Sequence, residues 1–195
     1  MSLLEKHYTQ EHQIFRESIR RYFEKEVTPR VEEWEKAGIV PKSVWKDFGS
    51  QGFLCPWLPE AYGGVGADLL YSLISMEEGA KTRFSGFLFF LHSDIIVPYL
   101  ESFGSEKQKQ RWLPGCASGD IITAIAMTEP GTGSDLAAIR TTAVRDGDHY
   151  VINGQKTFIS NGINCGLVIV VAKTDPAAKP AHAGFSLIVV EDGTP

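Results

Sequence analysis

Two short stretches of the chain carry residue types that suit the binding of a charged ligand. The first, TEPGTGSDL, spans residues 128–136 and places Gly131 and Gly133 between the hydroxyls of Thr128 and Ser134. Glycine adopts backbone conformations that other residues resist, so consecutive amide groups in such a stretch can converge on an anion. Glycine, proline, serine and aspartate are equally the residues of a tight turn. Taken by itself, the stretch favours the turn over the ligand loop.

Other residues with suitable chemistry have structural alternatives of the same kind. Glu129 and Asp135 invite interpretation as an acid and base pair, but carboxylates beside glycines more often cap turns. Phe158 begins the second stretch, FISNG, and an aromatic residue in a strand is usually packed in a core. His92, in FLHSDI, is a candidate for substrate contact, and a buried histidine satisfied by hydrogen bonds is an equal alternative.

The glycine spacing in the first stretch excludes two familiar phosphate-binding motifs. GTGSDL lacks the third glycine of the dinucleotide fingerprint, and no parallel βαβ unit follows it. The stretch also does not match G-x-x-x-x-G-K-[ST]. A phosphate bound here would therefore lie in a β-rich setting.

The elements that position these residues change character near residue 120. Apolar residues at helical spacing predict helices over 11–27, 41–52, 67–82, 84–100 and 105–119. Ser105, with Gln108 three residues later, is typical of a capping-box start. We expect residues 1–120 to form an all-α domain.

After residue 120, short runs rich in β-branched and aromatic residues alternate with turn signals. They predict strands over 121–128, 141–145, 149–152, 156–160, 167–172 and 185–190. The run 167–172 has no polar alternation, which predicts a strand buried on both faces. The expected fold class is α+β, with an incomplete antiparallel domain, barrel-like or a sandwich, over residues 121–195.

Composition and charge exclude several classes of function. The chain has 195 residues, 43% hydrophobic and 22% charged, with a net charge of −5 that gives no basic field for nucleic acid. Three cysteines without a CxxC and five histidines without metal-ligand spacing predict a reducing compartment and no metal site. The polar N-terminus predicts no signal peptide, and no apolar run is long enough to cross a bilayer. We expect a soluble, intracellular protein.

Longer segments around both stretches resemble one family. AIAMTEPGTGSDLAAIRT, followed by DGDHYVINGQKTFISNG, is similar to the signature region of acyl-CoA dehydrogenases, and the FISNG form looks like the long-chain branch. EHQIFRESIRRYFEKEVTPRVEEWEKAG, PEAYGGVGADL and FGSEKQKQRWLP sit where that family has its N-terminal helices and loops. Two long motifs in the correct order are far more specific than a pair of glycines.

The resemblance implies bound FAD and a role for each residue of the two stretches. Thr128 would bond the pyrimidine edge of the flavin, and Gly133 and Ser134 would lie near the pyrophosphate, with Ser134 also facing the pantetheine arm of an acyl-CoA. Phe158 would pack on the flavin face and Ser160 would bond near N5; many relatives carry Trp and Thr at these two positions. The complete set of implied cofactor-binding residues is Ile125, Ala126, Met127, Thr128, Gly133, Ser134, Phe158, Ile159 and Ser160.

The implied reaction is α,β-dehydrogenation of a fatty acyl-CoA to a trans-2-enoyl-CoA. A base removes the α-proton while the β-hydride moves to flavin N5, and the electrons pass to an electron-transferring flavoprotein. The family's base is a glutamate on a helical domain that follows the β domain, and Glu191 is at the wrong place in the pattern. The catalytic base is therefore unknown in this sequence, and we expect a truncated chain that is inactive by itself.

The resemblance also implies a homo-oligomer when the protein is intact, and a helix at 84–97 that lines the acyl-chain cavity as well as the core. The absence of an Arg- and Ser-rich transit segment favours the bacterial cytoplasm over the mitochondrial matrix. Two alternatives remain open. One is an acyl-CoA oxidase or flavin monooxygenase of the same fold, and the other is a non-catalytic module that binds a nucleotide or a partner.

Overall fold

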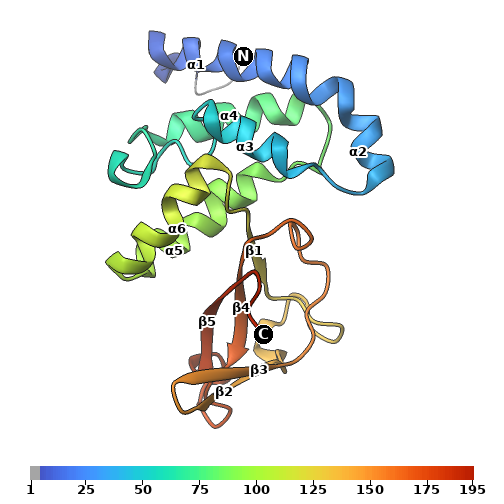
Figure 1. Ribbon diagram of the computed structural model, residues 1–195, viewed down its shortest axis with the longest axis vertical. Helices are drawn as coiled ribbons and strands as arrows, with labels where there is room; N and C mark the ends of the chain where they lie inside the picture. The colour runs from blue at the N-terminus through green and yellow to red at the C-terminus, as the bar shows by residue number, and fades with distance from the viewer. Residues whose placement is uncertain (1–4) are drawn as a thin grey trace. The chain divides into compact units, whose positions relative to one another are not determined.

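The computed structural model describes residues 5–195, which form two compact units (Figure 1). The first unit ends at Ile122 and is helical, and the second runs from Thr123 to Pro195 and is built on a sheet. Each unit has a buried apolar core of its own. A helical domain followed by a β domain confirms the expected fold class.

The helical unit contains α1 (Gln10–Tyr22), α2 (Val31–Ala37), α3 (Lys42–Ser50), α4 (Leu69–Lys81), α5 (Val97–Phe103) and α6 (Glu106–Ser118). π-Helical segments continue α1 over Phe23–Val27 and lead into α5 over Leu91–Ile96. Short 3-10 turns cover Glu5–His7, Thr28–Arg30 and Glu60–Tyr62. Among residues 5–195, no helix has both the length and the apolar character needed to cross a membrane.

Local signals explain where two of these helices begin. The capping box that the sequence predicts for α6 is confirmed, because the amide of Ser105 donates to Gln108 Oε1 at 2.8 Å and the amide of Gln108 donates to Ser105 Oγ at 3.4 Å. The helix expected from residue 84 begins only at residue 89. Arg83 has φ +56, outside the right-handed helical region, and Gly86 is a poor helix former, so the chain crosses from α4 in an irregular segment.

The core of the helical unit is largely aromatic. Phe48 is fully buried, and its ring centroid lies 5.2 Å from that of Phe87 and 5.1 Å from that of Phe89. Tilted and edge-on arrangements at these distances add attraction to the burial of apolar area. The packing fixes the segment that connects α4 to α5.

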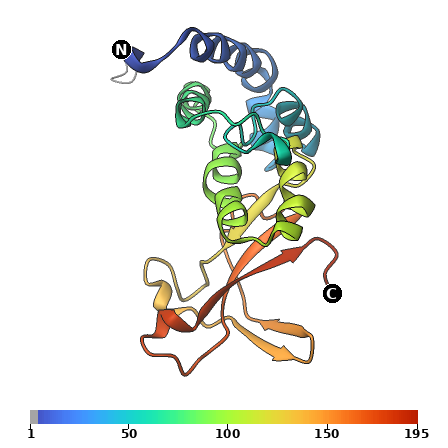
Figure 2. The same cartoon turned by 90° about the vertical axis from the view of Figure 1, so that its left-hand side faces the viewer.

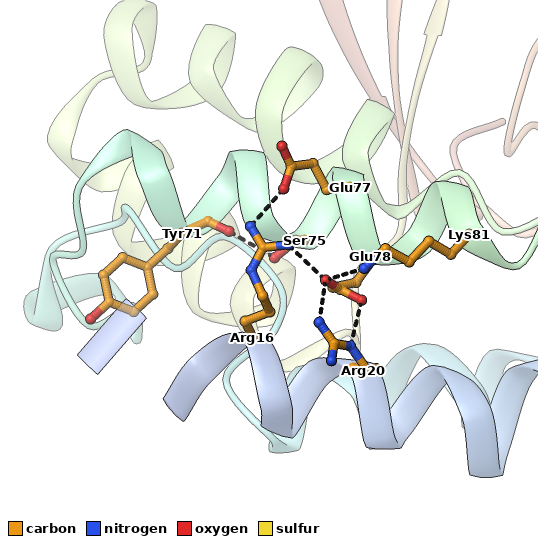
Figure 3. Close-up of polar contacts among 7 residues, drawn as sticks. All are labelled: Arg16, Arg20, Tyr71, Ser75, Glu77, Glu78 and Lys81. Atoms are coloured by element: carbon orange, nitrogen blue, oxygen red, sulfur yellow. Dashed lines mark hydrogen bonds and ion pairs between the residues drawn. The ribbon is translucent and has the colours of Figure 1, made fainter. Parts of the chain in front are cut away.

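A buried carboxylate joins α1 to α4 (Figure 3). The Glu78 side chain is only 1% exposed, and Oε1 accepts hydrogen bonds from Arg16 at 2.8 Å and from Lys81 at 2.7 Å. Arg20 donates to both Glu78 oxygens, at 3.1 and 3.2 Å. Burial alone would raise the pKa of Glu78, but the hydrogen bonds from its cationic partners outweigh burial and lower it. Two helices far apart in sequence are thereby held together.

The second unit has a mixed sheet of β1 (Thr123–Ala126), β2 (Thr142–Asp146), β3 (His149–Asn153), β4 (Leu167–Lys173) and β5 (Phe185–Glu191). The central strand β4 pairs antiparallel with β5 along its length, and parallel with β1 from Thr123↔Leu167 to Ala126↔Val170. β2 meets β4 in parallel at Thr142↔Lys173. The expectation of a purely antiparallel domain is therefore wrong in this detail. The long connection between β1 and β4 supplies the crossover that parallel neighbours require.

The predicted hairpin is confirmed, while one predicted strand is absent. β2 and β3 pair antiparallel around the two-residue turn Gly147–Asp148, where Gly147 has φ +58 (Figure 2). Residues 156–160 form no strand. Phe158 has φ +56, in the left-handed region that a strand cannot contain. Along β4, Leu167 and Ile169 are buried while Val168 and Val170 are half-buried, so burial is complete on one face only.

Replacing Glu78 with glutamine removes the anion that three cations share and leaves the partly exposed Glu77 as the ionic partner of the buried Arg16. We expect the free energy of unfolding of the helical unit to fall by about 3 kcal/mol, because breaking a buried ion pair by removing one partner is costly. Urea unfolding followed by tryptophan fluorescence measures this, since all four tryptophans precede residue 123.

The matched control is Glu32→Gln, which breaks the exposed 2.8 Å pair with Lys36 on α2. This change should alter the free energy of unfolding by no more than about 0.5 kcal/mol. Equal losses in the two variants would contradict a special role for Glu78.

Candidate functional site

The first ligand-binding stretch predicted from sequence begins on β1. Ile125 and Ala126 are the last residues of that strand, and Met127 and Thr128 follow it directly. Ala126 is buried, and Met127 and Thr128 are half-buried. The strand therefore delivers Thr128 to the edge of the sheet, where the irregular loop begins.

The loop after Thr128 is closed by its own backbone. The amide of Glu129 donates to the carbonyl of Thr132 at 2.9 Å, and the amide of Thr132 donates back at 3.0 Å. Gly133 and Ser134 lie beyond this turn and are exposed. Within residues 5–195 their amides donate no hydrogen bond, so both are available to an anionic ligand.

The two glycines of the loop contribute space rather than unusual torsion angles. Neither Gly131 nor Gly133 has a positive φ, so the alternating conformation of a nest is not present. A Cβ added to either residue would meet nothing within 4 Å. The room beside the backbone is therefore open to a bound group, and a side chain would occupy it.

The second stretch presents an aromatic ring to solvent. Phe158 is 92% exposed, which excludes the core packing that the sequence left as an alternative. Ser160 is also exposed, and Ile159 between them is half-buried and accepts the Gly162 amide at 3.0 Å. An exposed phenylalanine held in a left-handed conformation is uncommon, and such residues occur at ligand sites more often than elsewhere.

Direct contacts bring the two stretches side by side. The amide of Thr157 donates to the carbonyl of Thr128 at 3.0 Å. Lys156 Nζ donates to the carbonyl of Met127 at 2.9 Å. Residues about thirty positions apart in sequence thus share one surface, with the Phe158 ring on one stretch and Thr128 on the other.

The buried side chain of Glu129 connects the first stretch to Lys156 and to the residues before β2. Its side chain is 6% exposed and accepts from the Arg140 amide at 2.7 Å, the Thr141 amide at 2.9 Å and the Thr141 hydroxyl at 2.6 Å. Lys156 Nζ lies 2.9 Å from the same carboxylate. Burial alone would raise the pKa of Glu129, but these hydrogen bonds lower it to about 2. A carboxylate that is ionised and saturated with donors is not available as a base.

Sequence reasoning missed Lys156 and Thr141 as parts of this arrangement. A signal was present, because Lys156 is the only Asp, Glu, Lys or Arg between Asp148 and Lys173. A lone cation in an uncharged segment needs a partner if the segment folds against protein. The nearest suitable anion lies in the other stretch.

His92 belongs to the core of the helical unit rather than to a ligand surface. It is fully buried, and its Nε2 lies 3.0 Å from the carbonyl oxygen of Cys116. Burial lowers the pKa of His92 to about 4, although the Cys116 contact acts in the opposite direction. The alternative of a structurally satisfied histidine is the one that holds. Asp135 is exposed at the end of the glycine loop.

The helical unit also contains an apolar hollow of about 410 Å³. Its walls include Phe23 and Met76, together with Phe84, Phe87, Phe89 and Phe90 from the predicted acyl-chain segment. Arg83 stands among the lining residues and is exposed. An apolar hollow of this size suits a flexible hydrocarbon chain.

The lowered pKa of Glu129 makes the stability of the β domain depend on pH. A carboxyl whose folded pKa is about 2, against an ordinary value of 4.5, contributes its full stabilisation above pH 4.5 and loses it as the pH falls toward 2. We expect Glu129→Gln to lose this pH dependence. Hydrogen exchange of peptides that cover β2 and β4, measured between pH 7 and pH 2, reports it.

The exposed carboxylate of Asp148, in the β2–β3 turn, provides the control variant Asp148→Asn. This variant should keep the pH profile of the original protein. A Glu129→Gln protein with an unchanged profile would refute the assignment.

The geometry described above agrees with comparisons to known proteins. Two family models match the chain in order: Acyl-CoA dehydrogenase, N-terminal domain, over residues 9–120, and Acyl-CoA dehydrogenase, middle domain, over residues 124–195. The long-chain specific acyl-CoA dehydrogenase of Rattus norvegicus, a mitochondrial protein, is 48% identical over 187 residues, which are 95% of this chain and 43% of the relative.

Solved structures give the same result. The crystal structure of acyl-CoA dehydrogenase from Geobacillus kaustophilus matches with a TM-score of 0.94 and 56% identity, covering 96% of this chain and 50% of that one. A glutaryl-CoA dehydrogenase from Mycobacterium smegmatis in complex with FADH2 matches with a TM-score of 0.86 and 30% identity, covering 98% and 48%. The chain spans about half the length of the relatives it matches. With both family domains matched in order over nearly all of its residues, the chain belongs to the acyl-CoA dehydrogenase family.

Proposed function

We propose that the protein containing this chain carries out FAD-dependent α,β-dehydrogenation of a fatty acyl-CoA. The observation that carries the proposal is the exposed Phe158 ring, next to an exposed Ser160 and held beside Thr128 by the Thr157 amide. A flat aromatic ring with hydroxyls around it suits a flavin, which has one large apolar face and a polar edge. A relative with 30% identity is described in complex with FADH2.

The residues of the surface fit different parts of the cofactor. Thr128 is proposed to donate to the pyrimidine edge of the flavin, Phe158 to pack on its face and Ser160 to bond near N5. The unpaired amides of Gly133 and Ser134 suit the pyrophosphate, since backbone N–H groups bind anions without a neighbouring cation. When bound, FAD supplies the acceptor for the hydride that leaves the β-carbon.

Two parts of the chain, each considered by itself, are proposed to contact the substrate. Ser134, exposed and without a partner of its own in residues 5–195, suits the polar pantetheine arm. The hollow lined by Phe84, Phe87 and Phe90 suits the hydrocarbon chain, because burial of each methylene contributes about 0.8 kcal/mol. We assign the proton-abstracting base to none of these residues, because Glu129 is saturated with hydrogen bonds.

The remaining parts of the proposal concern the electron acceptor, the assembly, the location and the acyl chain. The electrons are proposed to pass to an electron-transferring flavoprotein, and the intact protein to assemble as a homo-oligomer. A bacterial cytoplasmic location is proposed ahead of the mitochondrial matrix. A 48% identical relative is described as long-chain specific, which supports a long acyl chain as substrate.

Removing the Ser160 hydroxyl tests the role near N5. We expect Ser160→Ala in the complete protein to slow flavin reduction by acyl-CoA about tenfold, the cost of one hydrogen bond that strengthens during the reaction. FAD occupancy should fall much less. Stopped-flow absorbance of the flavin gives the reduction rate, and the ratio of flavin to protein absorbance gives the occupancy.

Ser186→Ala is the matched control, because this hydroxyl lies on β5 and contacts Thr174 at 2.7 Å. It should leave the rate unchanged. An unchanged single-turnover rate in Ser160→Ala would argue against the N5 role.

The purified 195-residue chain tests where the base lies. We expect it to show no acyl-CoA-dependent dye reduction, because no residue here is assigned as the base. We also expect it to bind FAD weakly, because it spans about half the length of the relatives it matches. The measurement is reduction of an artificial electron acceptor in the presence of FAD and a long-chain acyl-CoA. Turnover by this chain would overturn the expectation and place a base within it.

A further inference from the structure

We propose that the buried Glu129–Lys156 pair positions the flavin surface, the surface formed by Thr128, Phe158 and Ser160. The pair holds the start of the first stretch, at Thr128, against Phe158–Ser160 of the second stretch, so that both contact one cofactor. This inference rests on the proposed function and deepens it, because it names residues that act on FAD without touching it.

Lys156 makes the first half of the connection. Its side chain is 11% exposed, and its Nζ lies 2.9 Å from Glu129 Oε1 and 2.9 Å from the Met127 carbonyl. Met127 precedes Thr128, and Lys156 stands two residues before Phe158. One ammonium group thus fixes the backbone of both stretches next to the residues proposed to contact FAD.

Glu129 makes the second half, and it is tied to the sheet. Its carboxylate accepts the backbone amides of Arg140 and Thr141, the two residues that precede β2. The carbonyl of Thr141 in turn accepts the Lys173 amide at the end of β4, at 2.8 Å. Backbone donors cannot rotate away as side chains do, so the carboxylate has one favourable position.

The backbone around the pair leaves little room for adjustment. A Cβ on Gly154 would lie 2.3 Å from Thr141 Oγ1, the hydroxyl that donates to Glu129. The approach of the second stretch to β2 therefore requires glycine at this position. This close approach places Lys156, two residues later in the chain, within reach of Glu129.

The position of the exposed Phe158 ring depends on the backbone contacts next to it. Phe158 has no aromatic partner within residues 5–195 and is 92% exposed, so no side-chain packing holds the ring. Its left-handed backbone costs about 1 kcal/mol and persists only where neighbouring contacts impose it. The contacts immediately before it come from Lys156 and Thr157.

The test compares FAD affinity with stability in the complete protein. FAD is titrated into the apoprotein and followed by flavin fluorescence, and the resolution of the visible flavin bands reports the environment of the ring. We expect Lys156→Met to raise the FAD dissociation constant by about tenfold or more, as happens at metal sites when a residue that orients a ligand is lost. Lys156→Arg, which keeps the cation, should recover most of that affinity.

A stability-matched control separates position from folding. Val171→Ala removes buried apolar volume from β4, where Val171 pairs with Leu187 of β5, and leaves the Glu129–Lys156 pair unchanged. At a similar loss of unfolding free energy, it should change the FAD dissociation constant by less than about twofold. If Lys156→Met does not fold, Lys156→Gln, whose amide still donates one hydrogen bond, takes its place in the same comparison.

The outcomes distinguish this inference from the proposed function. FAD affinity that falls in Lys156→Met and not in Val171→Ala, with recovery in Lys156→Arg, supports the positioning role. FAD binding by the original protein with equal affinity in Lys156→Met overturns the positioning role and leaves the proposed function intact. Failure of the original protein to bind FAD overturns both.

Discussion

The buried carboxylate of Glu129 is the interaction on which the candidate site depends. A charge inside a protein is costly unless it is paired and hydrogen-bonded, and Glu129 meets this requirement with donors from Arg140, Thr141 and Lys156. These donors come from two separate parts of the chain. Satisfying one charge therefore requires the glycine loop, the start of β2 and the second stretch to meet at one place.

The helical unit uses a buried carboxylate in a different way. Among residues 5–195, Glu78 accepts only from the long side chains of Arg16, Arg20 and Lys81, which reach it from α1 and α4. Such donors can follow small movements of the helices, whereas the amides bound to Glu129 are parts of the backbone itself. Glu78 is suited to joining two helices, and Glu129 to holding a loop at a defined position.

Features set by neighbouring residues were predictable from the sequence. The capping box of Ser105 and Gln108 and the two-residue hairpin turn at Gly147 both depend on contacts within a few positions. The parallel pairing of β1 with β4 depends on residues more than forty positions apart, so local pattern indicated the strands but not their order. The residues 156–160 have the composition of a strand, and a tertiary contact to Thr128 places them in an irregular segment instead.

In the candidate site, too, local features were predictable from the sequence and long-range contacts were not. The two motifs identified its residues, but the role of each depended on distant partners. The sequence favoured a capping role for Glu129 but did not indicate that Arg140, Thr141 and Lys156 would be its partners. In the fold, the groups with saturated hydrogen bonds lie beneath the surface, while the Phe158 ring, the Ser160 hydroxyl and the amides of Gly133 and Ser134 remain open.

The ring of Phe158 is exposed and does not contribute to the packing of the β domain. Phe158 gains little from burial in the chain as it stands, and its left-handed backbone is unfavourable for a residue with a Cβ. Folding of the β domain alone therefore gives no reason for a large apolar side chain at this position. The proposed flavin would return the free energy of burying the ring, and the backbone donors around Glu129 hold the neighbouring backbone at a defined position.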